Sequence, residues 1–210
     1  MKYEWRKIEK SLYLPGTKPE MIVIPKFNLI TIEGKGDPNG PDFGDRVEAL
    51  YSISYTIRMM PKKGITPEGY FEYAVYPLEG LWDLSEDGRG RPELDKSQLL
   101  YKIMIRQPDF VTQEVFNNAL EIVKKNKPIK LLDELKFEEI EDGLSVQMMH
   151  LGSYDNEKKS FDMMKDYIKE NRLKIKNMVH REIYISDPRK SEPEKLKTVL
   201  RYMVEDIAIF

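Results

Sequence analysis

The sequence predicts an α+β fold made of two similar βαββ units, which together form an antiparallel sheet with helices on one face. Apolar residues recur at strand and helix spacing, with glycine and proline clusters between these segments. The order strand, helix, strand, strand occurs twice, at a period of about 120 residues, far too long for a solenoid. We therefore expect two halves related by a pseudo-twofold axis, with a ligand cleft between them.

The first half spans about residues 20–110 and opens with a strand at residues 25–32, PKFNLITI, which is rich in β-branched residues. The loop GKGDPNG follows and lacks the spacing of a phosphate-binding loop. A helix is predicted from Asp42, as its cap, to about Met60, because Pro61 ends the apolar repeat.

Two further strands complete the first half. Residues 70–84 are predicted as a strand bent at Pro77 and Gly80, and LLYKIMI at residues 99–105 as the next strand. The segment between them, SEDGRGRPELDKS, is predicted as a loop because it is polar and rich in turn residues. Thr112 is predicted to cap the helix that follows.

The second half spans about residues 130–210 and is predicted to open with a hairpin, because strands at 135–141 and 144–151 flank the dipeptide DG. Residues 1–20 form an N-terminal extension, in which we expect Trp5 to be an anchor. The chain as a whole is interpreted as one domain. The remaining elements are a helix at 156–171, a strand at 178–186, and a last strand, or a helix and a strand, at 196–209.

The composition excludes several classes of function. The chain has 210 residues, no cysteine, two histidines and a net charge of −2. Disulfides, thiolate nucleophiles and Cys- or His-rich metal sites are therefore excluded, and we expect no metal and no cofactor. The 34 basic and 36 acidic residues argue against a nucleic-acid partner. Because the sequence has neither a signal peptide nor an apolar run of ~20 residues, we expect a cytoplasmic protein without a membrane partner.

The segment VHREIYISDPR contains the densest group of reactive side chains. If it is a strand, alternation places His180, Glu182 and Tyr184 on one face, while Ile183 and Ile185 lie on the other and are expected to face the helices. The polar face is then either an ordinary solvent-facing side or a cleft. Since no nucleophile elbow or zinc motif is present, the chemistry left is that of carboxylates and phenols, with water as the nucleophile.

Four contiguous motifs stand out in the sequence: PLEGLW at 77–82, IRQPDFVT at 105–112, HLGSYDNE at 150–157 and HREIYISDPRKSEPEKLKTVLR at 180–201. They resemble the GyrI-like small-molecule-binding family, in particular its stand-alone branch. Ser153 stands where that family commonly has Pro, and Arg181 where a second His is common. Neither difference removes the acidic residue at position 182.

The resemblance implies the same pair of βαββ units and a small-molecule ligand. Related domains of MerR-type multidrug regulators bind flat, often cationic drugs, with a buried Glu that matches Glu182. Some stand-alone members are cyclopropanoid cyclopropyl hydrolases that detoxify DNA alkylators of the yatakemycin and duocarmycin type, whereas the founding member is a DNA gyrase inhibitor. Hydrolysis of such a cyclopropane is the expected function. The alternative is a non-catalytic module that binds, senses or sequesters flat amphiphiles.

On this resemblance, we expect Glu182 to be the general base and Tyr55 the hydrogen-bond donor, with Tyr184 or Tyr154 as substitutes for Tyr55. Tyr51 lies one turn from Tyr55 and either reaches the ligand or belongs to the core. The partner is expected to be a planar aromatic molecule, and the oligomeric state stays open. The remaining candidate ligand-binding residues are Trp82, Tyr101, Phe43, Met104 and His180.

Overall fold

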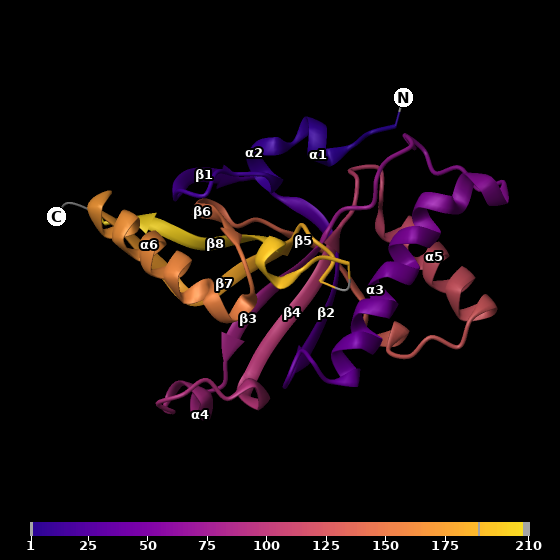
Figure 1. The fold of residues 1–210 in the computed structure, drawn as a ribbon. Helices are drawn as coiled ribbons and strands as arrows, with labels where there is room; N and C mark the ends of the chain where they lie inside the picture. Colours follow the sequence, from indigo (N-terminus) through magenta and orange to yellow (C-terminus); the bar gives the residue numbers. More distant parts are fainter. Residues whose placement is uncertain (1, 189, 208–210) are drawn as a thin grey trace. The chain divides into compact units, whose positions relative to one another are not determined.

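The computed structural model describes residues 2–188 and 190–207. These residues form two compact units, one made of residues 2–4 and 27–140 and the other of residues 5–26 and 141–207. Both units combine antiparallel strands with helices (Figure 1), which confirms the predicted α+β class.

The first unit follows the predicted order strand, helix, strand, strand. Its sheet has the order β3-β4-β2-β5. Helix α3 packs on β2 and β4, and α5 packs beside α3. The elements are β2 (Phe27–Lys35), α3 (Pro41–Met59), η1 (Met60–Lys63), β3 (Leu78–Leu84), α4 (Glu86–Arg89), η2 (Lys96–Gln98), β4 (Leu99–Arg106), α5 (Gln113–Asn126), η3 (Leu132–Glu134) and β5 (Lys136–Ile140).

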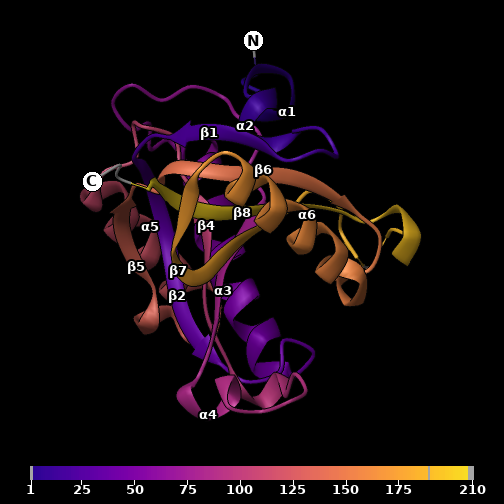
Figure 2. The same cartoon turned by 90° about the vertical axis from the view of Figure 1, so that its left-hand side faces the viewer.

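The second unit repeats that order and adds an N-terminal segment. Its sheet has the order β1-β6-β8-β7, and α6 lies along one face of it (Figure 2). Met164 and Ile168 of α6 pack on Val146, Met148 and Leu200 in a buried core. The elements are α1 (Trp5–Ile8), α2 (Lys10–Tyr13), β1 (Glu20–Ile24), β6 (Gly143–Leu151), η4 (Tyr154–Asn156), α6 (Glu157–Glu170), β7 (Leu173–Tyr184), η5 (Pro193–Lys195) and β8 (Lys197–Asp206).

The predicted hairpin around Asp142 is wrong. The strands exist, but β5 pairs with β2 while β6 pairs with β1 and β8. Asp142 is buried and forms an ion pair with Arg181, so the dipeptide DG lies where the chain leaves one unit and enters the next. A charged partner distant in sequence has overridden the local turn preference.

Three local predictions also differ from the structure. The strand predicted over 70–84 begins only at Leu78, and Tyr73 instead forms an isolated β-bridge with Tyr3. Helix α3 begins at Pro41, with Gly40 as its cap, so Asp42 lies inside the first turn. The predicted loop after β3 contains the short helix α4, capped by the Ser85 side chain. The predicted cap of α5 is confirmed, because the hydroxyl of Thr112 accepts from the Val115 N–H at 3.3 Å.

The N-terminal segment belongs to the second unit, because β1 pairs with β6. Trp5 is buried and its ring centroid lies 4.9 Å from that of Tyr13, in agreement with a role as an anchor. Strand β8 begins one residue after the predicted start, at Lys197, and the end of the predicted element, at 208–209, lies outside the described residues.

Candidate functional site

Strand β7 places three of the predicted site residues in direct contact. His180 Nε2 lies 2.9 Å from Glu182 Oε1, and the Tyr184 hydroxyl donates to Glu182 Oε2 at 2.8 Å. Alternate residues of a strand share a face, so this row follows directly from the sequence pattern. The carboxylate of Glu182 is buried and has one polar partner on each oxygen.

The expectation that Ile183 and Ile185 face the long helix of this unit is wrong. His180 lies on the side of α6, because its ring centroid is 4.7 Å from that of Phe161. The ring centroid of Phe161 in turn lies 5.4 Å from that of Tyr202 on β8. The row of Glu182 therefore lies on the helix-covered face. The opposite face is covered by the N-terminal segment, which the sequence did not identify as a second layer.

A second buried carboxyl group, that of Glu157, was not among the predicted site residues. Glu157 opens α6 and is 8% exposed. Burial, together with the negative charges of Glu182 and Asp155, raises the pKa of Glu157 to about 9. Its Oε1 has no hydrogen-bond partner among the residues that the structure describes. Glu157 is the last residue of the motif HLGSYDNE, but nothing local indicates that this glutamate is buried.

Two tyrosines lie against this pair of carboxyl groups. The rings of Tyr154 and Tyr184 meet edge to face, with centroids 6.0 Å apart. Burial raises the pKa of Tyr154 to about 12, and the charges of Glu182 and Glu157 add to the effect. The Tyr154 phenol is therefore a neutral donor at physiological pH. The second unit thus combines two buried carboxyl groups with two phenols.

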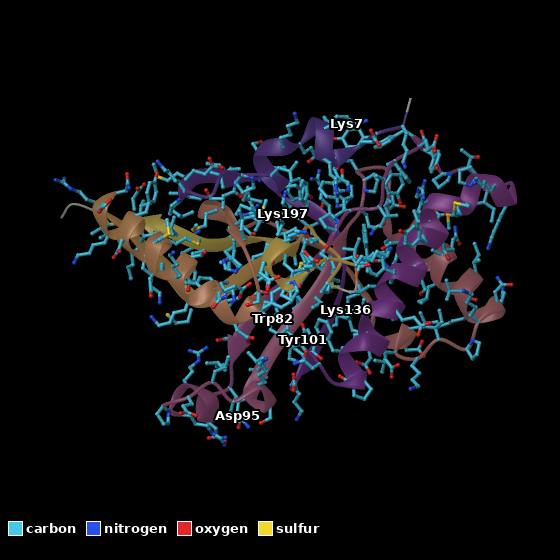
Figure 3. The ribbon with its side chains drawn as sticks, in the orientation of Figure 1. Lys7, Trp82, Asp95, Tyr101, Lys136 and Lys197 are labelled. Carbon is cyan, nitrogen blue, oxygen red and sulfur yellow. The ribbon has the colours of Figure 1, made fainter. Side chains whose placement is uncertain are left out.

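The first unit holds a separate cluster of aromatic rings. Trp82 on β3 faces Tyr101 on β4, with centroids 5.2 Å apart (Figure 3). Phe43, in the first turn of α3, lies 5.2 Å from Tyr101 and 6.0 Å from Trp82. The Tyr101 hydroxyl donates to Asp42 Oδ2 at 3.4 Å. Three of the predicted wall residues are thereby in mutual contact.

Glycines allow two of these rings to lie flat on the sheet. A Cβ at Gly34 would be 2.4 Å from Tyr101 Cε2, and one at Gly80 would be 2.6 Å from Trp82 Nε1. Only glycine leaves room for such a close approach of ring to backbone. The glycine that the sequence suggested as a strand bend at position 80 thus serves to seat the indole.

Three other predicted residues stand apart from this cluster. Met104 is fully buried, and strand alternation places it on the opposite face of β4 from Tyr101. The rings of Tyr51 and Tyr55 lie 6.0 Å apart on α3. Tyr55 is 49% exposed, and its role as a donor stays a prediction.

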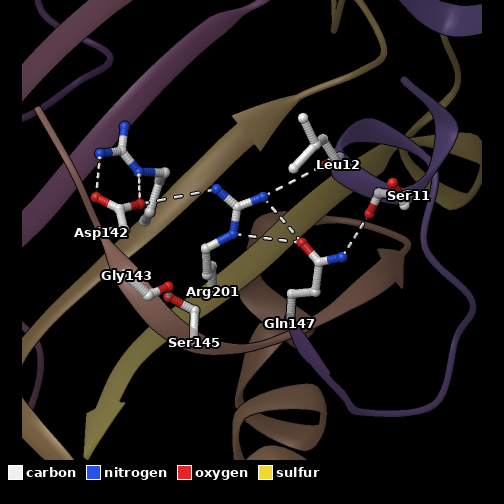
Figure 4. Close-up of polar contacts among 8 residues, drawn as sticks. Ser11, Leu12, Asp142, Gly143, Ser145, Gln147 and Arg201 are labelled. Carbon is white, nitrogen blue, oxygen red and sulfur yellow. Dashed lines mark hydrogen bonds and ion pairs between the residues drawn. The ribbon is translucent and has the colours of Figure 1, made fainter. Parts of the chain in front are cut away.

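The other face of β7 and β8 carries a buried ionic network (Figure 4). Arg181 donates to both oxygens of Asp142, at 2.6 and 2.7 Å. Arg201 lies 3.7 Å from Asp142 Oδ2 and donates to Gln147 Oε1 at 2.9 Å. The network holds the N-terminal segment through Arg201 Nη2 to Leu12 O (3.1 Å) and Gln147 Nε2 to Ser11 O (2.7 Å).

Two further properties concern the described part of the chain. Among these residues, no three His, Asp or Glu side chains gather in a way that could hold a metal ion. None of the helices described is both long enough and apolar enough to cross a membrane.

Comparison with protein families gives one match, which covers most of the chain. The model of the GyrI-like small molecule binding domain matches residues 17–204. No curated protein matches the chain significantly.

Solved structures give similar folds over nearly the whole chain. A protein from Listeria innocua described as a hydrolase is 37% identical, with a TM-score of 0.89 over 97% of this chain and 100% of that chain. A second hydrolase from Listeria innocua is 38% identical, with a TM-score of 0.90 over 98% and 100%. The C-terminal domain of EcmrR shares the fold, at 15% identity and a TM-score of 0.54 over 90% and 98%.

Proposed function

Because the chain belongs to the GyrI-like small-molecule-binding family, we propose that it hydrolyses electrophilic aromatic small molecules by adding water to a cyclopropane. The substrates proposed are cyclopropanoid alkylators of the duocarmycin and yatakemycin type, and the consequence is detoxification. The description of the 37% identical Listeria innocua protein as a hydrolase supports an enzymatic role.

The observation that carries the proposal is that Glu157 and Glu182 are both buried in the second unit, where the charge of Glu182 acts on Glu157. Glu157 stays protonated at neutral pH, because burial and the nearby charge of Glu182 raise its pKa to about 9. A buried carboxyl group that stays protonated can supply the proton in a reaction for which a second glutamate is the base. This division of roles is the one that water addition to an activated ring requires.

The reaction uses one water and no cofactor. Glu182 accepts a proton from water while the water oxygen bonds to the cyclopropane carbon. The carbon–carbon bond of the strained ring breaks, and its electron pair enters the dienone, which becomes an aromatic phenolate. Glu157 supplies a proton to that oxygen, and the two carboxyl groups then exchange protons with solvent. Stabilising the developing charge on the oxygen lowers the barrier.

Aromatic side chains support a planar ligand. Tyr154 and Tyr184 lie beside the carboxyl pair, and Trp82, Tyr101 and Phe43 form the ring cluster of the first unit. Such rings bind flat aromatic molecules by stacking and edge contacts. We propose Tyr154 and Tyr184 as ligand-contacting residues beside the carboxyl groups of the second unit, while Trp82, Tyr101 and Phe43 stay predicted ligand-binding residues of the first unit.

A turnover assay tests the function. Purified protein is incubated with a duocarmycin-type compound in excess, and the ring-opened hydrate is quantified by mass spectrometry. More than one equivalent of hydrate per protein is expected. Glu182→Gln is expected to lower kcat by about 10²- to 10⁴-fold while compound binding persists. Glu170→Gln, a change at an exposed position of α6, is the matched control and is expected to retain turnover.

A second candidate function is binding without turnover. Both oxygens of Glu182 have polar partners, His180 Nε2 at 2.9 Å and the Tyr184 hydroxyl at 2.8 Å. A carboxylate held in this way is also suited to be the fixed countercharge for a cationic aromatic ligand. In the same assay, tight binding without hydrate would establish this role, and Glu182→Gln would then weaken cationic ligands selectively.

A further inference from the structure

His150 on β6 makes two hydrogen bonds that bracket the segment carrying Tyr154 and Glu157. Its Nδ1 lies 2.9 Å from Ser160 Oγ in α6, and its Nε2 lies 3.0 Å from the Ser153 carbonyl oxygen in the preceding loop. The side chains of His150 and Ser160 are both buried, and that of His150 is 4% exposed. One imidazole therefore joins the strand to both ends of the stretch 153–160.

The geometry fixes the protonation pattern of this contact. A carbonyl oxygen can only accept, so Nε2 of His150 carries the hydrogen and donates to Ser153. In the neutral ring Nδ1 is then the acceptor, and the hydroxyl of Ser160 donates to it. Gly152, with φ of +127°, makes the turn that brings the Ser153 carbonyl over the ring.

The bracketed stretch carries two groups of the candidate site. Tyr154 follows Ser153 directly and meets Tyr184 edge to face. Glu157 lies one helical turn before Ser160 on the same side of α6, and both are buried. Anchors at 153 and 160 therefore limit the movement of both the phenol and the carboxyl group.

We propose that His150 is a positioning residue, which holds residues 153–160 so that Tyr154 and Glu157 are presented to Glu182. The proposal rests on the proposed function for its catalytic meaning, but the positioning itself is measurable without substrate. The ionisable groups that interact with Glu157 are Glu182, Asp155 and Tyr154. A buried His–Ser contact that served only stability would leave the ionisation of Glu157 unchanged in any variant that still folds.

The experiment follows the Glu157 carboxyl by NMR in the full ligand-free chain labelled with side-chain ¹³C-glutamate, with Glu157→Gln used for assignment. In His150→Leu, the loosened segment admits water to the carboxyl, so its apparent pKa is expected to fall from about 9 by at least about one unit. Ser160→Ala is expected to shift it in the same direction by less. His150→Gln retains a donor toward the Ser153 carbonyl, so the pKa of Glu157 in this variant is expected to stay close to its value in the unmodified protein. Ser54→Ala, at a buried serine of α3, is the matched control and is expected to cause no shift.

An unchanged titration of Glu157 and an unchanged Tyr154–Tyr184 contact in folded His150→Leu and Ser160→Ala would overturn the proposal. If His150→Leu fails to fold, Ser160→Ala decides alone. Where the unmodified protein turns over substrate, His150→Leu is also expected to lower kcat by up to about 100-fold. Absence of turnover in the unmodified protein would refute the proposed function but would leave the NMR result as the test of positioning.

Discussion

Arg181 binds Asp142 through two parallel hydrogen bonds, from Nε to Oδ2 at 2.6 Å and from Nη2 to Oδ1 at 2.7 Å. The pair connects the residue directly before β6 to the position directly before Glu182 in β7. A bidentate, buried pair of this kind adds geometric specificity as well as energy, so it holds the start of β6 in place against β7. The departure from the family pattern at position 181 is therefore matched by a carboxylate 39 residues earlier.

Asp142→Asn is expected to destabilise the fold by about 3–5 kcal/mol, because it leaves the buried guanidinium groups of Arg181 and Arg201 facing a neutral amide. The midpoint of urea unfolding measures this change. Asp162→Asn, which removes an exposed i,i+4 pair with Lys158, is the control and is expected to leave the midpoint nearly unchanged.

The effect of Asp142→Asn is also expected to depend on pH. Burial alone would raise the pKa of Asp142, but the charges and hydrogen bonds of Arg181 and Arg201 outweigh burial and lower it. Because the pKa of Asp142 is lower in the folded state, its ionised form stabilises the fold above the unfolded pKa of about 3.9. This stabilisation is lost as the pH falls through the folded pKa. The difference between the two proteins should therefore shrink in acid. A constant difference down to the lowest measurable pH would contradict the ionic origin.

Glu157→Gln is expected to stabilise the folded protein at alkaline pH. The folded pKa of about 9 means that folding must keep this group protonated, so stability declines as the pH rises from about 4.5 to 9. At ~1.4 kcal/mol per pKa unit, the variant should gain on the order of 2–5 kcal/mol at pH 8 and nothing near pH 4.5. Thermal unfolding across this pH range measures it, with Glu170→Gln as the exposed control on α6. An equal gain at both pH values would contradict it.

The pH dependence of turnover provides an independent test of Glu157 as proton donor. Since the active form has Glu157 protonated, kcat/KM should fall on the alkaline side with an apparent pKa of about 9. In Glu157→Gln the alkaline decline near pH 9 should disappear, with kcat lowered by about 10²-fold. Initial rates of hydrate formation from pH 6 to 10 measure both effects. If the decline persists in the variant, another group donates the proton.

Gly80→Ala is expected to move the Trp82 indole off the sheet, because the added Cβ would lie 2.6 Å from Nε1. The expected loss of stability is about 1–3 kcal/mol, accompanied by a shift in Trp82 emission in a Trp5→Phe background. Gly44→Ala in α3 is the matched control, since nothing lies within 4 Å of its Cβ. That change should stabilise by up to about 1 kcal/mol and leave the emission unchanged. Identical spectra in both variants would contradict the seating role of Gly80.

The sequence by itself determined the α+β class, the repeated strand–helix–strand–strand order and the row of His180, Glu182 and Tyr184. These features depend on periodicity, which is a local property of the chain: a period of two fixes which residues of a strand share a face, and a period near 3.6 fixes the helices. The motifs also identified the family correctly, because they are contiguous stretches of sequence.

Only the tertiary structure decided which face of the sheet each row occupies and which charged groups become buried. The predicted hairpin does not form, since β5 pairs with β2 while β6 pairs with β1 and β8, and Asp142 is buried in an ion pair with Arg181. Glu157 and His150 are the two ends of the motif HLGSYDNE, but nothing local indicates their burial or their contacts, because these depend on residues that are distant in sequence or across a turn. Desolvation and charge coupling are properties of packing, so the ionisation states on which the proposed chemistry depends could be obtained only from the folded chain.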